Sequence, residues 1–297
     1  MPELPEVETI RLQLNQVLKG LKIVGVEVLS SKNFIGSVND IVGEKISSVE
    51  RRAKIILIKL SHNRCLAIHL KMTGQLIFRD MGLKEDAIGD QNNGPFAVRE
   101  MPNKYTRVIV EFTSGAKLYF NDLRKFGWMK VIGIRDGKSG IKDKYANLSE
   151  LANLGPEAID EKTFSLEYLK KIFSKTKKAI KLILLDQGKI AGIGNIYANE
   201  ALFLAGIKPE KLANQLNEKE IEKLRNSVIK ILKEAIKHQG TSDKDEAYRQ
   251  TTGEKGSHQN YLQVYGREGK KCRQCGKEIK RIKIGGRGTF YCPNCQK

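Results

Sequence analysis

Residues 272–295 read CRQCGKEIKRIKIGGRGTFYCPNC and decide the fold of the carboxyl end. Two Cys-x-x-Cys pairs, Cys272 with Cys275 and Cys292 with Cys295, are separated by 16 residues. This spacing lets two turns present four thiolates tetrahedrally to one Zn²⁺. A metal-free cluster of buried cysteines is the alternative, but the neighbouring Lys, Arg and Gly residues leave no apolar core for it. The stretch therefore predicts a zinc hairpin with one structural Zn²⁺ per chain and no open position for catalysis.

The loop between the two pairs combines glycines with positive charge at Gly285, Gly286 and Arg287. Glycine lets the backbone approach a phosphate closely, and a guanidinium offers it a planar fork of donors. Taken by itself, Arg287 indicates a phosphate contact of a general kind. The tail from Gln263 onward carries ten basic and two acidic residues, so the predicted hairpin is strongly basic.

The net charge of the whole chain also indicates a phosphate-bearing partner. Its 297 residues include 53 Lys and Arg against 34 Asp and Glu, which gives a net charge of +19. Such a surface favours a polyanionic partner, because neutralising phosphates releases counterions without any reading of sequence. An anionic membrane is the alternative, but no apolar stretch approaches the roughly 18 residues of a spanning helix. We therefore expect a soluble protein that binds nucleic acid.

The amino terminus and the fifth cysteine indicate the compartment. The first eight residues, MPELPEVE, are acidic where a signal peptide is basic and then apolar. Cys65 stands alone in an apolar run, which is typical of a small buried residue. Metal-type cysteine spacing without a disulfide framework favours a reducing, cytoplasmic environment.

An apolar pattern at helical spacing opens the chain, and a β-rich region follows it. The helical positions are Val7, Ile10, Leu14, Val17 and Leu18. Short β-rich runs separated by turn residues then predict a mostly antiparallel sheet domain over residues 21–133. The irregular segment 79–103 predicts a long loop.

The period becomes helical after Pro156. Helical segments are expected around residues 164–173, 180–185, 196–204 and 224–236. The polar stretch 239–260 predicts a flexible loop. The fold class is therefore α+β, with domains at 1–135 (helix and sandwich), 150–260 (helical) and 263–297 (zinc finger).

A glycine-rich turn joins two of the expected helices at residues 186–197. Gly192 and Gly194 allow a tight double turn, and Asn195 could cap the next helix. Helix starts of this kind bind phosphate. The pattern is not a dinucleotide fingerprint, because Tyr197 stands where its third glycine belongs and a helix precedes it. A capped helical hairpin and a DNA clamp remain equally open.

The chain start offers a possible nucleophile. Removal of Met1 would leave Pro2 with a secondary amine whose pKa is near that of an α-amino group, about 8. Such an amine could attack a sugar carbon to form an iminium, and Glu3 would be within reach to move protons. The alternative is ordinary, because Glu3 also favours the dipole of the first helix.

Six motifs together resemble the formamidopyrimidine-DNA glycosylase family of bacterial 8-oxoguanine repair enzymes. They begin at Pro2 (PELPEVET), Arg51 (RRAK), His69 (HLKMTG), Asp122 (DLRKFG), Gly192 (GIGNIYA) and Gly286 (GRGTFYC). The resemblance implies a helical domain with a helix-two-turns-helix motif. Leu4 favours this purine-acting branch over the related endonuclease VIII, whose opening motif is similar to Pro-Glu-Gly-Pro.

The resemblance also implies catalytic roles. Pro2 resembles the Schiff-base nucleophile, Glu3 the acid that opens the deoxyribose ring, and Glu6 a further acidic residue of the pocket. Lys54, expected on a strand, resembles the lysine that contacts phosphate and assists β-elimination. Arg287 resembles the residue that assists δ-elimination; since a guanidinium rarely loses a proton, electrostatic stabilisation of the leaving phosphate is the better role.

Extrusion of a damaged base leaves a gap that the protein must fill. Met72, Arg124 and Phe126 match the three gap-filling positions of the family, with Arg124 suited to pair with the orphaned cytosine. Lys177 and Asn195 match phosphate-contacting positions. Tyr105 stands where the family commonly has a DNA-contacting His.

The sequence thus predicts a bifunctional glycosylase and lyase for oxidised purines, a cytoplasmic, nucleoid-associated bacterial enzyme that acts as a monomer on damaged double-stranded DNA. Two alternatives stay open. One is an endonuclease VIII-like glycosylase for oxidised pyrimidines, and the other is a zinc-ribbon protein that binds DNA without catalysis.

Overall fold

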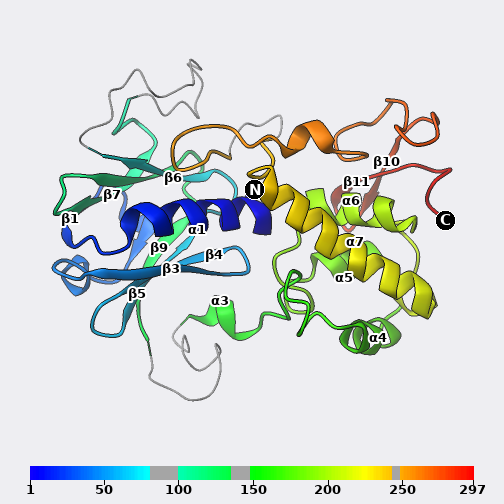
Figure 1. Cartoon of the computed structure of the whole chain (residues 1–297), viewed down its shortest axis with the longest axis horizontal. Coiled ribbons are helices and arrows are strands. Elements are labelled where there is room, and N and C mark those ends of the chain that lie inside the picture. Colours follow the sequence, from blue (N-terminus) through cyan, green and yellow to red (C-terminus); the bar gives the residue numbers. More distant parts are fainter. Residues whose placement is uncertain (81–99, 135–147, 243–247) are drawn as a thin grey trace. The chain divides into compact units, whose positions relative to one another are not determined.

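The structure is a computed structural model that describes residues 1–80, 100–134, 148–242 and 248–297. The chain forms two compact units (Figure 1). The first, here called the β unit, comprises Met1–Ala152 and His238–Gln259, and the second, the helical unit, comprises Asn153–Lys237 and Asn260–Lys297. The loops expected at 79–103 and 239–260 lie partly outside the described residues.

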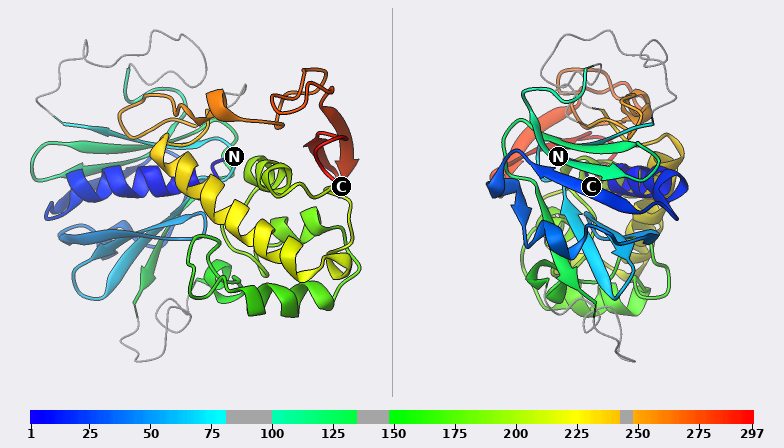
Figure 2. Two further views of the ribbon diagram at one scale, coloured as in Figure 1. Left: turned by 45° about the vertical axis from the view of Figure 1, so that its right-hand side comes forward. Right: turned by 90° about the vertical axis from the view of Figure 1, so that its left-hand side faces the viewer.

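Helix α1, Leu4–Leu18, opens the β unit as its apolar spacing predicts. Val7, Ile10, Leu14 and Leu18 are fully buried and belong to the main hydrophobic core. The helix lies between the two sheets of the unit (Figures 1 and 2). Asn15 of this helix fixes it to a strand, because Asn15 Oδ1 accepts a 2.9 Å hydrogen bond from the backbone N–H of Val49.

Two sheets form a sandwich around this core. The four-stranded sheet has the order β1-β7-β8-β6, with bounds Ile23–Val28, Thr106–Phe112, Lys117–Asp122 and Gly74–Arg79. The five-stranded sheet has the order β2-β9-β5-β4-β3, with bounds Phe34–Ile35, Trp128–Gly133, Arg64–His69, Ile55–Leu60 and Ile46–Arg52. Short 3₁₀ turns, η1 (Ser31–Asn33) and η2 (Val38–Asp40), flank β2. Every pairing between the described strands of the sandwich is antiparallel except β2 with β9, so the expected antiparallel sandwich is confirmed with one parallel addition.

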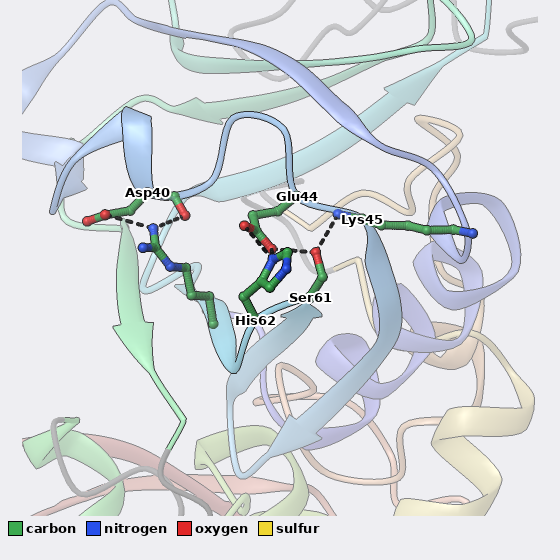
Figure 3. A network of polar contacts seen from close by, with 6 residues as sticks. Asp40, Glu44, Lys45, Ser61 and His62 are labelled. Atoms are coloured by element: carbon green, nitrogen blue, oxygen red, sulfur yellow. Dashed lines mark hydrogen bonds and ion pairs between the residues drawn. The ribbon is translucent and has the colours of Figure 1, made fainter.

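A polar network secures the turn between β4 and β5 (Figure 3). Glu44 accepts hydrogen bonds from the Ser61 hydroxyl and from His62 Nδ1, and the Ser61 hydroxyl in turn accepts one from the backbone N–H of Lys45. Arg64 Nη1 contacts Asp40 Oδ1 at 2.7 Å. The network ties this hairpin to the loop before β3, so it serves the fold.

The described residues of the segment 238–259 belong to the β unit, although the predicted domain bounds of 150–260 group this segment with the helices. Tyr248 belongs to the core of the sandwich. Gln13 Nε2 of α1 donates to Gln250 Oε1 at 2.6 Å, and the backbone N–H of Phe78 donates to the carbonyl of Thr251 at 2.9 Å. These polar contacts between distant residues leave no periodic signal in the sequence.

The helical unit contains α4 (Leu166–Ser174), α5 (Ile180–Leu185), α6 (Asn195–Ala205) and α7 (Glu218–Lys237), with a 3₁₀ turn η4 (Ala213–Gln215). The short α3 (Ser149–Ala152) precedes this unit. The turn η5, His258–Tyr261, leads to the hairpin of β10 (Lys280–Ile284) and β11 (Arg287–Tyr291). Ser165 caps α4 through its hydroxyl, and Gly206 ends α6 in the left-handed region. None of the described helices has the length and apolar character that crossing a bilayer requires.

Candidate functional site

The start of α1 holds Pro2, Glu3 and Glu6 in a fixed arrangement. All three residues are buried, and Glu3 and Glu6 are only 3% and 1% exposed. Glu3 is the N-cap residue and forms a capping box with Glu6, in which the backbone N–H of Glu3 donates to Glu6 Oε2 at 2.8 Å. The start of the helix therefore fixes the position of Pro2.

The second oxygen of Glu6 contacts a distant segment of the β unit. Glu6 Oε1 accepts a 2.8 Å hydrogen bond from the backbone N–H of Thr241. Gly240 beside it has a φ of +82°, and a Cβ there would lie 2.9 Å from Glu6 Cγ, so only glycine fits without a shift. Burial first, and then the negative charge of Glu6, raise the pKa of Tyr248 well above its usual value. Tyr248 thus stays protonated and donates to the carbonyl of Gln239 at 2.9 Å.

Lys54 lies in the turn between β3 and β4, so its expected place on a strand is wrong. The chain reverses there because Ala53 adopts a positive φ of 53°. Arg51 holds this turn, since its Nη1 donates to the carbonyl of Ala53 at 2.8 Å while its Nε contacts Glu8 Oε2 at 2.7 Å. Lys54 is only 7% exposed.

The charge of Lys54 acts on a neighbouring histidine. Burial, followed by the positive charges of Lys71 and Lys54, lowers the pKa of His69 to about 3. His69 is therefore neutral at physiological pH. Its Nδ1 accepts a 3.0 Å hydrogen bond from the backbone N–H of Lys71, which fixes the beginning of the loop that carries Met72.

The three expected gap-filling residues occupy two loops at one end of the sandwich. Met72 follows β5 and is half-buried, whereas Arg124 and Phe126 lie between β8 and β9 and are exposed. The Arg124 guanidinium lies 4.7 Å from the centre of the Phe126 ring, which is a cation–π contact. Tyr105 is half-buried just before β7, and its backbone N–H donates to Asn103 Oδ1 at 2.9 Å.

The remaining expected residues belong to the helical unit. Lys177 is exposed just before α5. Asn195 is the first residue of α6, and the N-cap position belongs to Gly194, so the expected capping role of Asn195 is wrong. Its Nδ2 instead donates to the carbonyl of Gly288 in β11 at 3.1 Å. The side chain is engaged by the hairpin because α6 and β11 pack together.

A buried lysine supports the same strand. Lys181 on α5 is fully buried, and its Nζ donates to Thr289 Oγ1 at 2.7 Å and to the carbonyl of Gly288 at 2.9 Å. Asn199 Oδ1 accepts from the backbone N–H of Phe290 at 2.9 Å. These contacts anchor β11 directly after Arg287, whose own side chain is exposed.

The four cysteines of the two Cys-x-x-Cys pairs converge, with their Sγ atoms within 4.8 Å of one another. Sγ separations of 3.9 Å (Cys272 to Cys295) and 3.4 Å (Cys275 to Cys292) bracket the roughly 3.8 Å that tetrahedral Zn–S bonds of about 2.3 Å require. All four are free thiols, and Cys272 and Cys292 are buried. The donor set fits Zn²⁺ and leaves it no position for water.

Comparison with known families matches nearly the whole chain. The formamidopyrimidine-DNA glycosylase N-terminal domain matches residues 1–129, and the formamidopyrimidine-DNA glycosylase H2TH domain matches residues 154–246. The zinc finger found in FPG and IleRS matches residues 269–297. The chain belongs to the formamidopyrimidine-DNA glycosylase family.

Individual members of this glycosylase family are similar over their full lengths. The formamidopyrimidine-DNA glycosylase of Pelotomaculum thermopropionicum is 41% identical over 304 residues, covering 100% of this chain and 99% of that protein. Lactococcus lactis Fpg in complex with DNA containing an abasic site has a TM-score of 0.83 at 33% identity, covering 100% of both chains. The L. lactis Fpg (MutM) complex with DNA containing Fapy-dG has a TM-score of 0.82 at 33% identity, covering 99% of this chain and 100% of that one.

These findings confirm the family resemblance, the α+β fold with a helix-two-turns-helix domain, and the structural zinc site. The structure also gives contacts to polar residues to which sequence reasoning assigned no role, namely Asp122, Lys181 and Thr241. A signal existed for Lys181, because it interrupts the apolar run Ile180–Leu185 and is still buried. Thr241 has no such signal, since its contribution is a backbone N–H.

Proposed function

We propose that this chain is a bifunctional DNA glycosylase and lyase of base excision repair that removes oxidised purines, 8-oxoguanine and formamidopyrimidines, from duplex DNA through a Schiff base on Pro2. Membership of the family supports the substrate class, as does the Fapy-dG duplex bound by the L. lactis relative. The observation that supports the catalytic assignment is the capping box at Glu3, the residue next to the amine that removal of Met1 would leave on Pro2.

The first step is displacement of the base. The lone pair of the Pro2 amine forms a bond to C1′ while the bond between C1′ and the base breaks, and the base departs with a proton. Glu3 then gives a proton to O4′ as the sugar ring opens, and the nitrogen lone pair forms the iminium. Glu6 orients this pair through the backbone N–H of Glu3.

Two eliminations follow from the iminium. Loss of a C2′ proton breaks the bond from C3′ to its phosphate, and a second elimination breaks the bond to the 5′ phosphate. Lys54, nearly buried in the turn held by Arg51, contacts phosphate and moves protons in the first elimination. Arg287 stabilises the leaving phosphate in the second, so the product is a one-nucleotide gap with phosphate at both ends.

The DNA contacts follow the same assignment. Met72 and Phe126 act as apolar wedges in the gap left by the extruded base, and Arg124 pairs with the orphaned cytosine. Lys177 and Asn195 contact phosphates, and Tyr105 contacts the DNA in place of the family's His. We further propose that the protein acts as a monomer in the bacterial cytoplasm, associated with the nucleoid through its net charge of +19.

Borohydride trapping tests the function directly. The chain, purified with Met1 removed as verified by intact mass, should become covalently linked to a duplex containing 8-oxoguanine in the presence of borohydride. Peptide mapping should place the adduct on the first peptide. A chain extended at its amino terminus should not trap, whereas the same extension at the carboxyl terminus serves as the matched control. Trapping by Pro2→Gly at the parental rate would contradict the assigned nucleophile.

The two alternatives give different outcomes. A zinc-ribbon protein that only binds DNA would shift the duplex in a gel and never trap. An endonuclease VIII-like enzyme would cleave a thymine glycol duplex faster than an 8-oxoguanine duplex. We expect the reverse order of cleavage rates.

A further inference from the structure

One buried carboxylate joins the two loops that carry Met72 and Arg124. Asp122 ends β8 and is completely buried. Its Oδ1 accepts hydrogen bonds from the Thr73 hydroxyl and, at 3.1 Å, from the backbone N–H of Arg124. Its Oδ2 accepts the backbone N–H of Gly127 at 2.7 Å. A single side chain thus fixes both ends of the second loop and the last residue of the first.

Thr73 completes the connection. Its Oγ1 also accepts a hydrogen bond from the backbone N–H of Arg124, at 3.1 Å, so this N–H is shared between Thr73 and Asp122. Thr73 directly follows Met72 in the chain. The expected wedge and the expected pairing residue therefore meet through one hydroxyl and one carboxylate.

Both loops adopt backbone conformations that need support. Lys71 and Lys125 have positive φ values of 50° and 56°, which cost residues with a side chain about 1–2 kcal/mol each. Gly127 leaves no room for a Cβ, which would lie 2.8 Å from Phe120 Cζ and 3.0 Å from the carbonyl of His69. Hydrogen bonds to an ionised carboxylate are stronger than those between neutral groups, and here they hold the loops in these conformations.

We propose that Asp122 and Thr73 are positioning residues that hold Met72, Arg124 and Phe126 as one unit and thereby set the preference for cytosine opposite the lesion. The proposal rests on the proposed function, because it assumes that these loops enter the duplex. With its backbone N–H fixed at two acceptors and its guanidinium over Phe126, Arg124 presents its donors in one direction. Loss of the Thr73 hydroxyl leaves that N–H with Asp122 alone of these two acceptors and widens the range of directions in which the Arg124 donors can point.

Thr73→Val tests the connection, because it keeps the side-chain shape and removes the hydroxyl. Thr73→Ser keeps the hydroxyl and should restore the parental behaviour. Thr113→Val is the matched control, since Thr113 is exposed at the end of β7 and away from both loops. Thermal unfolding of each variant identifies a general loss of folding.

The measurements are single-turnover excision of 8-oxoguanine opposite cytosine and opposite adenine, and borohydride trapping on a duplex with a preformed abasic site. We expect Thr73→Val to slow excision opposite cytosine roughly tenfold, as loss of hydrogen bonds to a charged group suggests. The ratio of the rates opposite cytosine and adenine should fall towards one. Trapping at the abasic site, which needs no base extrusion, should stay within about twofold of the parent. Thr73→Ser and Thr113→Val should keep both the rate and the ratio.

A double-mutant cycle with Arg124→Ala separates positioning from stability. If Thr73 acts through Arg124, adding Thr73→Val to Arg124→Ala should leave the rate ratio unchanged. Independent, additive effects on the ratio would overturn the proposal, as would a parental ratio in Thr73→Val alone. Failure of the parent chain to trap on either duplex would instead overturn the proposed function, and this proposal with it.

Discussion

The Oε1 atom of Glu6 accepts a 2.8 Å hydrogen bond from the backbone N–H of Thr241, across 235 positions of sequence. Its Oε2 atom accepts the N–H of Glu3 at the same distance. One buried carboxylate therefore satisfies two backbone donors, one beside the expected nucleophile and one in the segment 238–259. Order at the helix start and order in that segment depend on the same side chain.

Glu6→Gln should uncouple these two sites. An amide has only one acceptor oxygen, so either Glu3 or Thr241 loses its partner while buried. An unsatisfied buried N–H costs about 1–3 kcal/mol, and we expect the free energy of unfolding in urea to fall by that amount. Excision should slow as well, because the position of Glu3 becomes less defined.

Glu27→Gln is the matched control, since Glu27 is exposed on β1. It should leave both the unfolding free energy and the excision rate unchanged. Equal stability of Glu6→Gln and the parent chain would show that the two hydrogen bonds make no net contribution to the free energy of unfolding.

Lys181→Met should loosen the hairpin beside Arg287. Methionine preserves the volume but removes the donors to Thr289, Gly288 and Asn199. We expect the free energy of unfolding to fall by about 2–4 kcal/mol, because hydrogen bonds from a buried charged group are strong and their acceptors lose a donor. The product mixture should shift from δ- towards β-elimination, which a denaturing gel resolves.

Lys219→Met, at an exposed position of α7, makes the same chemical change without these contacts. Its product mixture should match that of the parent. An unchanged ratio of β- to δ-elimination products in Lys181→Met would show that the action of Arg287 does not depend on the contacts that anchor β11.

The fold was predictable wherever a local pattern carries it. Helix α1 follows from apolar residues at helical spacing, and the zinc hairpin follows from four cysteines whose positions alone determine the donor set. Strand β2 was not predictable, because two residues, Phe34 and Ile35, are too short to show a period. Strand β3 is rich in Ser, Glu and Arg, and its half-exposed surface weakens the alternation that identifies strands.

The candidate site was predictable only in its motif residues. The contact of Glu6 with Thr241 spans 235 positions and that of Lys181 with Gly288 spans 107, so neither produces a local pattern. Asn195 shows the reverse case, since a helix start predicts a cap while tertiary packing directs the side chain to β11. Tertiary hydrogen bonding overrode the local preference at that position.

Removal of zinc should unfold the hairpin and abolish DNA binding. Because all four ligands come from residues 272–295, binding of the metal supplies much of the folding free energy of this segment. A thiol-reactive mercurial should release one Zn²⁺ per chain, measured with a chromogenic chelator. Cys292→Ser should release none and should no longer shift a duplex in a gel.

Cys65→Ala is the control for the cysteine change, since Cys65 is fully buried in β5 and stands outside the cluster. It should still release one Zn²⁺. Retention of the metal by Cys292→Ser would contradict the four-thiolate site.

Mild acid should destabilise the β unit through His258. Its Nδ1 lies 3.0 Å from Nδ1 of His238, so the contact requires one ring nitrogen to accept. Burial and then the charge of His238 lower the pKa of His258 from 6.5 to about 4. Between these values the unfolded chain binds a proton that the folded chain does not. The free energy of unfolding therefore falls as the pH decreases from 6.5, by at most about 1.4 kcal/mol per pH unit for this group.

His258→Phe tests this dependence. The free energy of unfolding, measured in urea at several pH values between 6.5 and 5, should have a smaller slope against pH for His258→Phe than for the parent. Identical slopes for His258→Phe and the parent would mean that His258 takes up its proton equally in the folded and unfolded states.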